Sequence, residues 1–193
     1  QPFKKGPDYI DPLWLGMAAQ RPCYNLDFHM MRRDEIEQQF ARAAADARIS
    51  LIEGNKGLYD GLDLDGSNSN AALAKLLGVP VVLVIDARGM RRGVGPLILG
   101  HQAFDRDIRI AGAILKNLRG SHHESKLRAV IGHYTDVEVI GAVQHDPGMR
   151  IAERHLGLVP ANEQDAARAR IRHVGERVAA QVDLDRLLAI GDS

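Results

Sequence analysis

Runs of apolar residues alternate along the chain with segments whose apolar residues recur at helical spacing. The strongest run is VPVVLVIDA at 79–87, and shorter apolar runs lie at 49–53, 108–115 and 137–143. A nearly continuous series of Val, Leu and Ile is typical of a parallel strand that is buried on both faces. We therefore expect strands at these four places.

The segments between and after these runs favour helices. We expect them at 34–47, from about Ser69 to Leu77, at 93–104, at 121–134, and from Asn162 to about Leu188. Strands that alternate with helices predict an α/β fold, with a doubly wound, mainly parallel sheet and helices on both faces. A length of 193 residues without a linker favours one domain.

The segment FKKGPDYIDP at 3–12 interrupts this pattern. It holds two lysines, two aspartates, two prolines and one glycine in ten residues. Pro7 and Pro12 cannot donate to a strand ladder, and Gly6 weakens either kind of element. We therefore expect a loop, whose charged side chains are the first candidates for a binding site.

Composition narrows the class of protein. Hydrophobic residues make up 45% and charged residues 26%, with a formal net charge of zero, which argues against nucleic acid and membrane partners. No apolar run approaches the roughly 20 residues that span a bilayer. The single cysteine, Cys23, excludes an internal disulfide and a multi-cysteine metal site. A cytoplasmic protein is the simplest interpretation.

Glu53 directly follows a predicted strand, at the edge where open α/β sheets bind ligands. A carboxylate in that place suits Mg²⁺, which prefers oxygen ligands and bridges them to phosphates. A helix-capping or solvated acid is the alternative interpretation. Polar residues also follow the other predicted strands, namely Asp86, Lys116, Asn117 and His145.

The loop at 3–12 offers two acids and a cation. Asp8 and Asp11 lie three residues apart, so both carboxylates could turn toward one site, although Asp also favours turns. Lys4 could reach a phosphate as a point charge, or could form only a weak surface ion pair.

A second loop, GNKGLYDG at 54–61, carries Lys56 and Asp60 among three glycines, which let a backbone approach a ligand closely. The sequence contains no G-x-x-x-x-G-K-[ST] motif and no G-x-G-x-x-G after a strand. An acid for Mg²⁺ without a phosphate-binding loop is an incomplete nucleotide site.

Several segments together resemble the cobyrinic acid a,c-diamide synthase family, in the same order. They are QPFKKGPDYIDP, RPCYNLD, IEGNKGLYDG, NAALAKLLG, VPVVLVIDARGM, RIAGAIL and ERHLGLVP. The family's synthetase domain has a P-loop fold similar to dethiobiotin synthetase. A P-loop unit normally precedes this region and a glutaminase domain follows it. The resemblance implies that residues 1–193 are a fragment of the synthetase domain without either part.

The resemblance also implies a reaction. In this family, a carboxylate of a tetrapyrrole attacks the γ-phosphate of ATP, and ammonia from the glutaminase domain displaces the acyl phosphate. Phosphoryl transfer of this kind depends on positioning and charge neutralisation. By resemblance, Asp8, Asp11 and Glu53 would organise Mg²⁺–ATP, with Glu53 and Asp11 as metal ligands. Lys4 would approach the phosphates or the acyl phosphate.

The resemblance also implies roles for residues of the second loop and for a residue near the adenine. Tyr59 and Asp60, with Lys56, would face the substrate carboxylate, and Asp60 would help to position successive intermediates. The family commonly has Asn near the adenine at the position of Lys116 in this chain. Asn117 follows directly, so either the nucleotide contact moves by one residue to Asn117 or the base is recognised differently.

Alternatives stay open. The form EGNKGLYDGLDLDGSNSN is closer to the branch linked to dissimilatory sulfite reductase, which implies siroheme as substrate in place of cobyrinic acid. A dethiobiotin-synthetase-like carboxylase, a P-loop switch ATPase and a scaffold are the other readings, and a homodimer is compatible with all of them. A switch has no use for a second acid cluster aimed at a substrate, which counts against that class.

If the polypeptide begins at Gln1, the expected site lacks its phosphate-binding loop. We then predict negligible binding of Mg²⁺–ATP to residues 1–193 alone, as measured by calorimetry. A micromolar dissociation constant would contradict this prediction.

Overall fold

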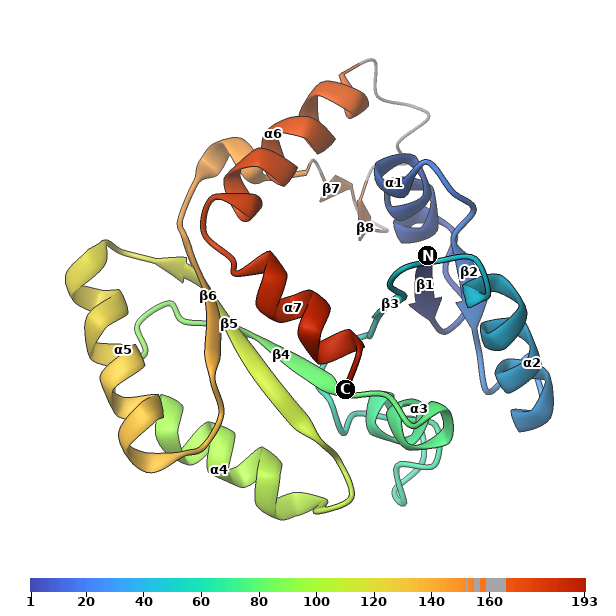
Figure 1. The fold of residues 1–193 in the computed structure, drawn as a ribbon, viewed down its shortest axis with the longest axis horizontal. Coiled ribbons are helices and arrows are strands. Elements are labelled where there is room, and N and C mark those ends of the chain that lie inside the picture. Colours follow the sequence, from blue (N-terminus) through green and yellow to red (C-terminus); the bar gives the residue numbers. More distant parts are fainter. Residues whose placement is uncertain (152, 155–156, 159–165) are drawn as a thin grey trace. The chain divides into compact units, whose positions relative to one another are not determined.

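The computed structural model describes residues 1–151, 153–154, 157–158 and 166–193 and confirms the predicted α/β class (Figure 1). The chain forms two compact units. Unit 1 comprises residues 1–78 and 150–173, and unit 2 comprises residues 79–149 and 174–193. Each unit contains a three-stranded sheet in which all strands are parallel.

The sheet of unit 1 has the order β2-β1-β3. Strand β1 (Pro2–Lys5) is central, and β2 (Tyr24–Leu26) and β3 (Leu51–Glu53) pair with its two edges. The parallel register sets Lys4 opposite Asn25 on one side and Glu53 on the other. The pairing therefore brings chain positions about 50 residues apart to the same edge of the sheet.

The prediction of a loop throughout 3–12 is wrong. Phe3 to Lys5 belong to the central strand, and helix α1 (Ile10–Ala19) already begins within the segment. Pro12 is the third residue of α1, where a backbone N–H has no partner inside the helix and its absence costs little. Only residues 6–9 connect the two elements without regular structure.

Helices cover both faces of this sheet. On one face α2 (Arg33–Ala44) and α3 (Asn70–Leu77) enclose a core cluster with the strands. Its buried members are Phe3, Leu26, Ile36 and Leu73. A second cluster joins Trp14 of α1 to Ala167 and Ile171 of α6 (Ala167–Ala179).

The start of α3 shows how the sequence fixes a boundary. The Ser69 hydroxyl accepts a hydrogen bond from the backbone N–H of Ala72 at 3.1 Å, and Gly78 ends the helix in a left-handed conformation. The predicted helix from Ser69 to Leu77 is thus confirmed.

Strands β7 (Glu153–Arg154) and β8 (Gly157–Leu158) form an antiparallel pair, while the rest of the motif ERHLGLVP lies outside the described residues.

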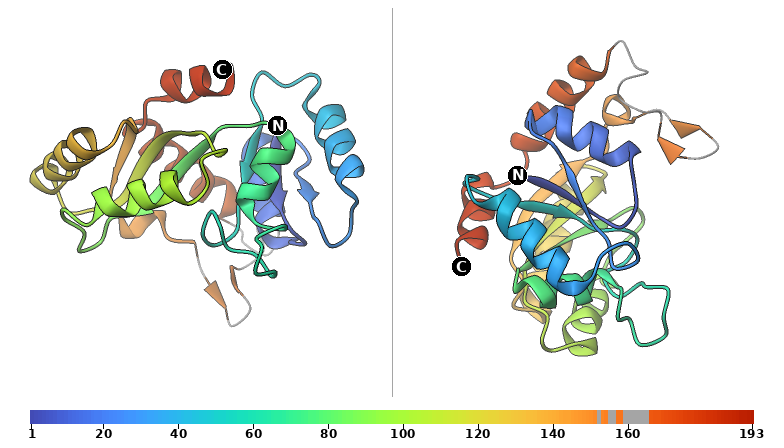
Figure 2. Two further views of the ribbon diagram at one scale, coloured as in Figure 1. Left: turned by 90° about the horizontal axis from the view of Figure 1, so that it is seen from below. Right: turned by 90° about the vertical axis from the view of Figure 1, so that its right-hand side faces the viewer.

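Unit 2 has the strand order β4-β5-β6, formed by β4 (Val81–Asp86), β5 (Ile110–Leu118) and β6 (Val139–Gln144). Helices α4 (Val94–Phe104) and α5 (Ser121–Tyr134) lie together on one face, and α7 (Leu184–Gly191) lies on the other (Figures 1 and 2). A short 3₁₀ turn, η1, spans Pro147–Met149. The predicted strands and helices of this region are confirmed.

Strand β4 is less buried than its sequence suggests. It pairs only with β5 among the described strands, so it forms an edge of its sheet, and Val84 is 62% exposed. The prediction that this apolar run is covered on both faces is therefore wrong at Val84. Apolar composition indicates a strand, but it does not report how many neighbours the strand has.

The C-terminal tail is two helices and not one. Helices α6 and α7 are separated at residues 180–183, where the chain runs antiparallel beside β6. The backbone N–H of Asp183 donates to the carbonyl of Ile140 at 2.7 Å, and the Asp183 carboxylate accepts from the N–H of Arg186 at 2.8 Å. The predicted start at Asn162 lies outside the described residues.

None of the helices in the described part of the chain has both the length and the apolar character that crossing a bilayer requires.

Gly6 ends β1 in a left-handed conformation with φ of +88°, and a Cβ there would lie 2.9 Å from Nδ2 of Asn55. Gly78 also has a positive φ but has open space around it. We expect Gly6→Ala to lower the free energy of unfolding by roughly 2–3 kcal/mol, because it adds a clash to the backbone strain. Gly78→Ala should cost only about 1 kcal/mol. Equal losses in urea denaturation would contradict the close approach to Asn55.

Candidate active site

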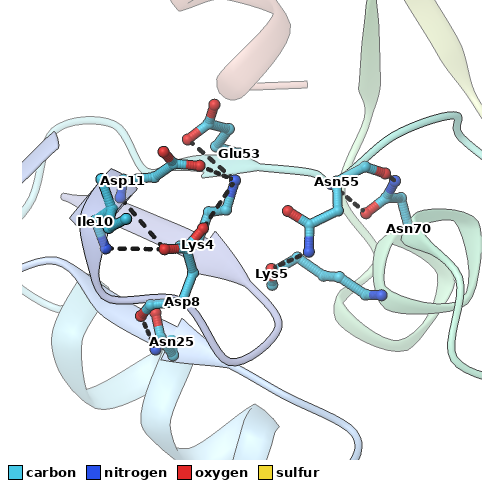
Figure 3. Close-up of polar contacts among 9 residues, drawn as sticks. All are labelled: Lys4, Lys5, Asp8, Ile10, Asp11, Asn25, Glu53, Asn55 and Asn70. Carbon is cyan, nitrogen blue, oxygen red and sulfur yellow. Dashed lines mark hydrogen bonds and ion pairs between the residues drawn. The ribbon is translucent and has the colours of Figure 1, made fainter. Parts of the chain in front are cut away.

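Lys4 occupies the centre of a charged cluster at the carboxyl end of β1 (Figure 3). The residue is 3% exposed, so its ammonium group is almost withdrawn from water. A charge in such a place is retained only where opposite charges surround it. Lys4 has three carboxylates around it, from Asp8, Asp11 and Glu53.

The three carboxylates come from three different elements. Nζ of Lys4 lies 2.6 Å from Oδ2 of Asp11 in the first turn of α1, and 3.5 Å from Oε2 of Glu53 at the end of β3. Oδ2 of Asp8, in the loop between β1 and α1, lies 4.0 Å away. The structure therefore brings together four residues that the sequence predicted to act at one site.

Asp8 combines the two interpretations that its sequence left open. Its Oδ1 accepts hydrogen bonds from the backbone N–H groups of Ile10 at 2.9 Å and Asp11 at 3.4 Å, which shapes the entry to α1. Its backbone carbonyl accepts from the side-chain amide of Asn25 at 2.6 Å. The turn that Asp8 forms is what aims Asp11 at Lys4.

The cluster carries excess negative charge. Burial alone would lower the pKa of Lys4, but the hydrogen bond that Lys4 donates to Asp11 and the charges of Glu53, Asp11 and Asp8 outweigh burial and raise it. Burial also raises the pKa of Glu53, and the like charges of Asp11 and Asp8 add to this effect, while Lys4 opposes it. Three carboxylates around one ammonium leave two negative charges, so an anionic phosphate can approach only together with a cation.

The donor set suits Mg²⁺. Within the described residues, no three His, Cys, Asp or Glu side chains are arranged to hold a metal ion by themselves. Mg²⁺ commonly takes one or two carboxylates and fills its remaining positions with water and phosphate oxygens. Asp11 and the half-exposed Glu53 provide such a pair of carboxylates.

An asparagine pair fixes the loop that follows β3. The backbone N–H of Asn55 donates to Oδ1 of Asn70 at 3.1 Å, and Nδ2 of Asn70 donates to the carbonyl oxygens of Asn55 at 2.5 Å and Gly57 at 2.8 Å. Nδ2 of Asn55 donates to the carbonyl of Lys5 at 2.8 Å. The start of the loop is thus tied to both α3 and β1 (Figure 3).

The other predicted residues of this loop lie outside the charged cluster. Oδ2 of Asp60 accepts a hydrogen bond from the N–H of Gly57 at 2.9 Å, which closes the turn. Lys56 is exposed and has a left-handed backbone, and Tyr59 is half-buried. None of the contacts described for these three side chains reaches Lys4, and their roles toward a substrate stay predictions.

Asn117 belongs to a separate cluster in unit 2. It adopts a left-handed conformation with φ of +61°, where the register between β5 and β6 shifts. Its Nδ2 donates to Oδ2 of Asp86 at 3.1 Å, and its Oδ1 lies 3.4 Å from Nδ1 of His145. Arg88 forms an ion pair with Asp86 at 2.8 Å. The expected role of Asn117 at a nucleotide stays a prediction.

Sequence reasoning missed Asp27, which lies near Lys5 of β1. Asp27 is buried, and its Oδ1 accepts from the N–H of His29 at 3.0 Å, while its Oδ2 has no hydrogen-bond partner among the described residues. Burial lowers the pKa of Lys5, and the charge of Asp27 opposes this effect. The side chain of Lys5 extends away from Lys4 (Figure 3). Asp27 follows β2, a strand too short to show in the hydrophobic pattern.

Cys23 is not activated as a nucleophile. Burial raises the pKa of its thiol to about 11, and the charge of Glu53 adds to this effect. A thiol with such a pKa is protonated at neutral pH.

Comparison with known sequences shows which proteins the chain is similar to. Residues 20–151 match the sequence model of a family described as AAA domain. The chain is also similar throughout to proteins named cobyrinate a,c-diamide synthase. It is 46% identical to one from Magnetococcus marinus over 98% of the chain, 40% to one from Methanobrevibacter smithii over 98%, and 41% to one from Methanosarcina acetivorans over 100%.

The predicted resemblance is thereby confirmed. The matched segments cover 41%, 42% and 41% of these three relatives, so the chain spans about two fifths of their length.

The positive charge of Lys4 lowers the pKa of Glu53, and this effect can be measured. Lys4→Met removes the one positive charge that lowers the pKa of Glu53 and leaves the repulsion from Asp11 and Asp8. We expect the pKa of Glu53 to rise in a pH titration followed by carboxyl-carbon NMR. Lys5→Met is the matched control and should leave that pKa unchanged, because Lys5 interacts with Asp27 instead. A fall in the pKa of Glu53 in Lys4→Met would disprove the arrangement.

Proposed function

Because the chain belongs to the AAA domain family, we propose that it is part of an ATP-dependent ligase that amidates carboxylate side chains of a tetrapyrrole. Cobyrinic acid is the proposed substrate, in line with the names of the similar synthases. The observation that carries the proposal is the buried ammonium of Lys4 among three carboxylates at the carboxyl end of β1 and β3. This arrangement of one ammonium group and three carboxylates can neutralise and position phosphate and carboxylate groups whose charge changes during the proposed reaction.

Asp11 and Glu53 would hold Mg²⁺, and Asp8 would keep Asp11 in place through its turn. When bound, Mg²⁺ neutralises phosphate charge and polarises the phosphoryl group that is transferred. The excess negative charge of the cluster favours a divalent cation over a free anion. Glu53 is the more accessible of the two ligands, since its side chain is half exposed.

Lys4 would hold the acids together before the nucleotide arrives and would then stabilise negative charge on the phosphates or on the acyl phosphate. A buried ammonium with three donors can exchange one carboxylate contact for a phosphate oxygen without becoming unpaired. Its 3.5 Å and 4.0 Å contacts to Glu53 and Asp8 are the looser ones and would be exchanged first.

The loop after β3 would face the substrate carboxylate with Lys56, Tyr59 and Asp60. The bonds from Asn70 to Asn55 and Gly57 hold the start of this loop, so its exposed part is presented from a fixed base. Asn117, a residue of unit 2, would contact the nucleotide. Ammonia would come from a glutaminase domain acting on glutamine, and we place the reaction in the cytoplasm.

Siroheme is the second substrate to test, because the loop at 53–70 resembles the branch associated with it. Both substrates would undergo the same carboxylate activation, so the residues around Lys4 do not separate them. A carboxylase or a switch ATPase would release ADP without forming an amide.

The test uses the full-length enzyme with ATP, Mg²⁺ and glutamine, and offers cobyrinic acid and siroheme separately. We expect two amidations of cobyrinic acid by mass spectrometry. Glu53→Gln should lower ADP release by about 100-fold or more, because it removes a charged metal ligand and preserves its size. Glutamine hydrolysis should continue. Glu37→Gln, an exposed acid on α2, is the matched control and should behave like the wild type.

The outcomes separate the readings. Amidation of siroheme alone would correct the substrate, and ADP release without an amide from either substrate would refute the ligase. Unchanged ADP release by Glu53→Gln would remove Glu53 from the metal site.

A further inference from the structure

A cavity lies between the two loops that follow β2 and β3. Its volume is about 590 Å³, within the range of about 300–1,000 Å³ that is usual for small-molecule sites. One wall is formed by residues 28–33 with Glu35, and the other by residues 62–63 and 67–68. Both walls follow the carboxyl ends of parallel strands, the same edge at which Lys4 holds its carboxylates.

Two apolar side chains that line the cavity are held out toward solvent. Met30 is 78% exposed and Leu62 is 79% exposed. A single exposed apolar residue needs no explanation, but two that face one cavity from opposite walls indicate an apolar ligand surface. Met adapts its shape to flat or irregular ligands. Its neighbour Met31 packs against the core cluster of unit 1, which anchors this wall.

One guanidinium in the cavity has free capacity for an anion. Arg32 is engaged by Asp34 at 3.0 Å and by Glu35 at 3.8 Å. Arg33 lies over the ring of Phe28, 5.6 Å from its centroid, and no described carboxylate pairs with it. Arg33 is therefore held in orientation by an aromatic face while its donors remain available.

Asp63, the acid on the opposite wall, already accepts hydrogen bonds from neighbouring side chains. Oδ2 of Asp63 accepts hydrogen bonds from Nδ2 of Asn68 at 2.8 Å and from the hydroxyl of Ser67 at 3.3 Å. Oδ1 of Asn68 in turn accepts from the N–H of Leu62 at 2.8 Å. These bonds fix the position of Leu62, so this wall is organised before a ligand binds.

The first wall is fixed by the buried Asp27. Its Oδ1 accepts from the N–H of His29, and its backbone carbonyl accepts from the N–H of Met31 at 3.0 Å. Met30 lies between these two anchored residues. Met30 and Leu62 are thus both held in place by hydrogen bonds of the neighbouring backbone.

We propose that this cavity binds the edge of the tetrapyrrole macrocycle, with Met30 and Leu62 against its apolar faces and Arg33 paired with a peripheral carboxylate. This assignment rests on the proposed function and adds to it the residues that select the substrate. A tetrapyrrole that carries acid side chains combines a broad apolar ring with negative charges at its rim. The cavity offers the complementary pair of surfaces, apolar tips on both walls and one unpaired guanidinium.

The experiment compares two pairs of variants in the full-length enzyme. Leu62→Ser is matched with Leu64→Ser, since Leu64 is fully exposed in the same loop but does not line the cavity. Arg33→Gln is matched with Arg42→Gln, near the other end of α2. Cobyrinic acid binding is measured by equilibrium dialysis, and kcat and KM are measured for cobyrinic acid and for ATP.

We expect Leu62→Ser and Arg33→Gln each to weaken cobyrinic acid binding about tenfold and to raise its KM similarly. The KM for ATP should stay within twofold of the wild type, and both control variants should bind cobyrinic acid normally. Met30→Ser tests the other wall and should weaken binding in the same way. The defects should persist when an ammonium salt replaces glutamine.

Each other outcome overturns the assignment. If the wild type amidates cobyrinic acid and the cavity variants bind it normally, the cavity is not the substrate site and the proposed function stands. If the defects vanish with ammonium, the surface serves the glutaminase domain instead. If the wild type neither binds nor amidates a tetrapyrrole, the proposed function fails and this assignment fails with it.

Discussion

The candidate site depends on the interaction of the Lys4 ammonium group with three carboxylates. Almost no water reaches it, so the cost of burying its charge must be offset by the carboxylates of Asp8, Asp11 and Glu53. Removing the partner of a buried charge typically costs about 3–5 kcal/mol, because an uncompensated charge then stays buried. The requirement for compensation therefore ties together β1, the first turn of α1 and the end of β3.

This constraint also explains why a highly charged segment can form the central strand of a sheet. Phe3 extends into the core cluster on one face of β1, and Lys4 extends toward the opposite face, where the acids are. Gly6 then allows the chain to leave the strand beside Asn55. The strand that supplies the site is thus held by an apolar anchor on one side and by an ionic one on the other.

Under the proposed function, the charged site and the cavity would take different parts of the ligase reaction. The acids around Lys4 suit a nucleotide with its metal ion, and the cavity suits an amphipathic acid. Both are built from loops at the carboxyl ends of neighbouring parallel strands, where a phosphoryl group and a substrate carboxylate have to meet. The chain belongs to the AAA domain family and is similar to the synthases, while the reaction, the substrate and this division stay proposals.

The sequence by itself determined most of the helices and strands, because periodicity and caps such as Ser69 and Gly78 act within a few residues. It also indicated that Lys4, Asp11 and Glu53 belong to one site, but only through the resemblance to a family. Tertiary structure decided that 3–12 supplies a central strand, that Val84 lies on an edge, and that Asp27 is buried. These features depend on which strands pair and in which register, and pairing between residues about 50 positions apart leaves no local pattern in the chain.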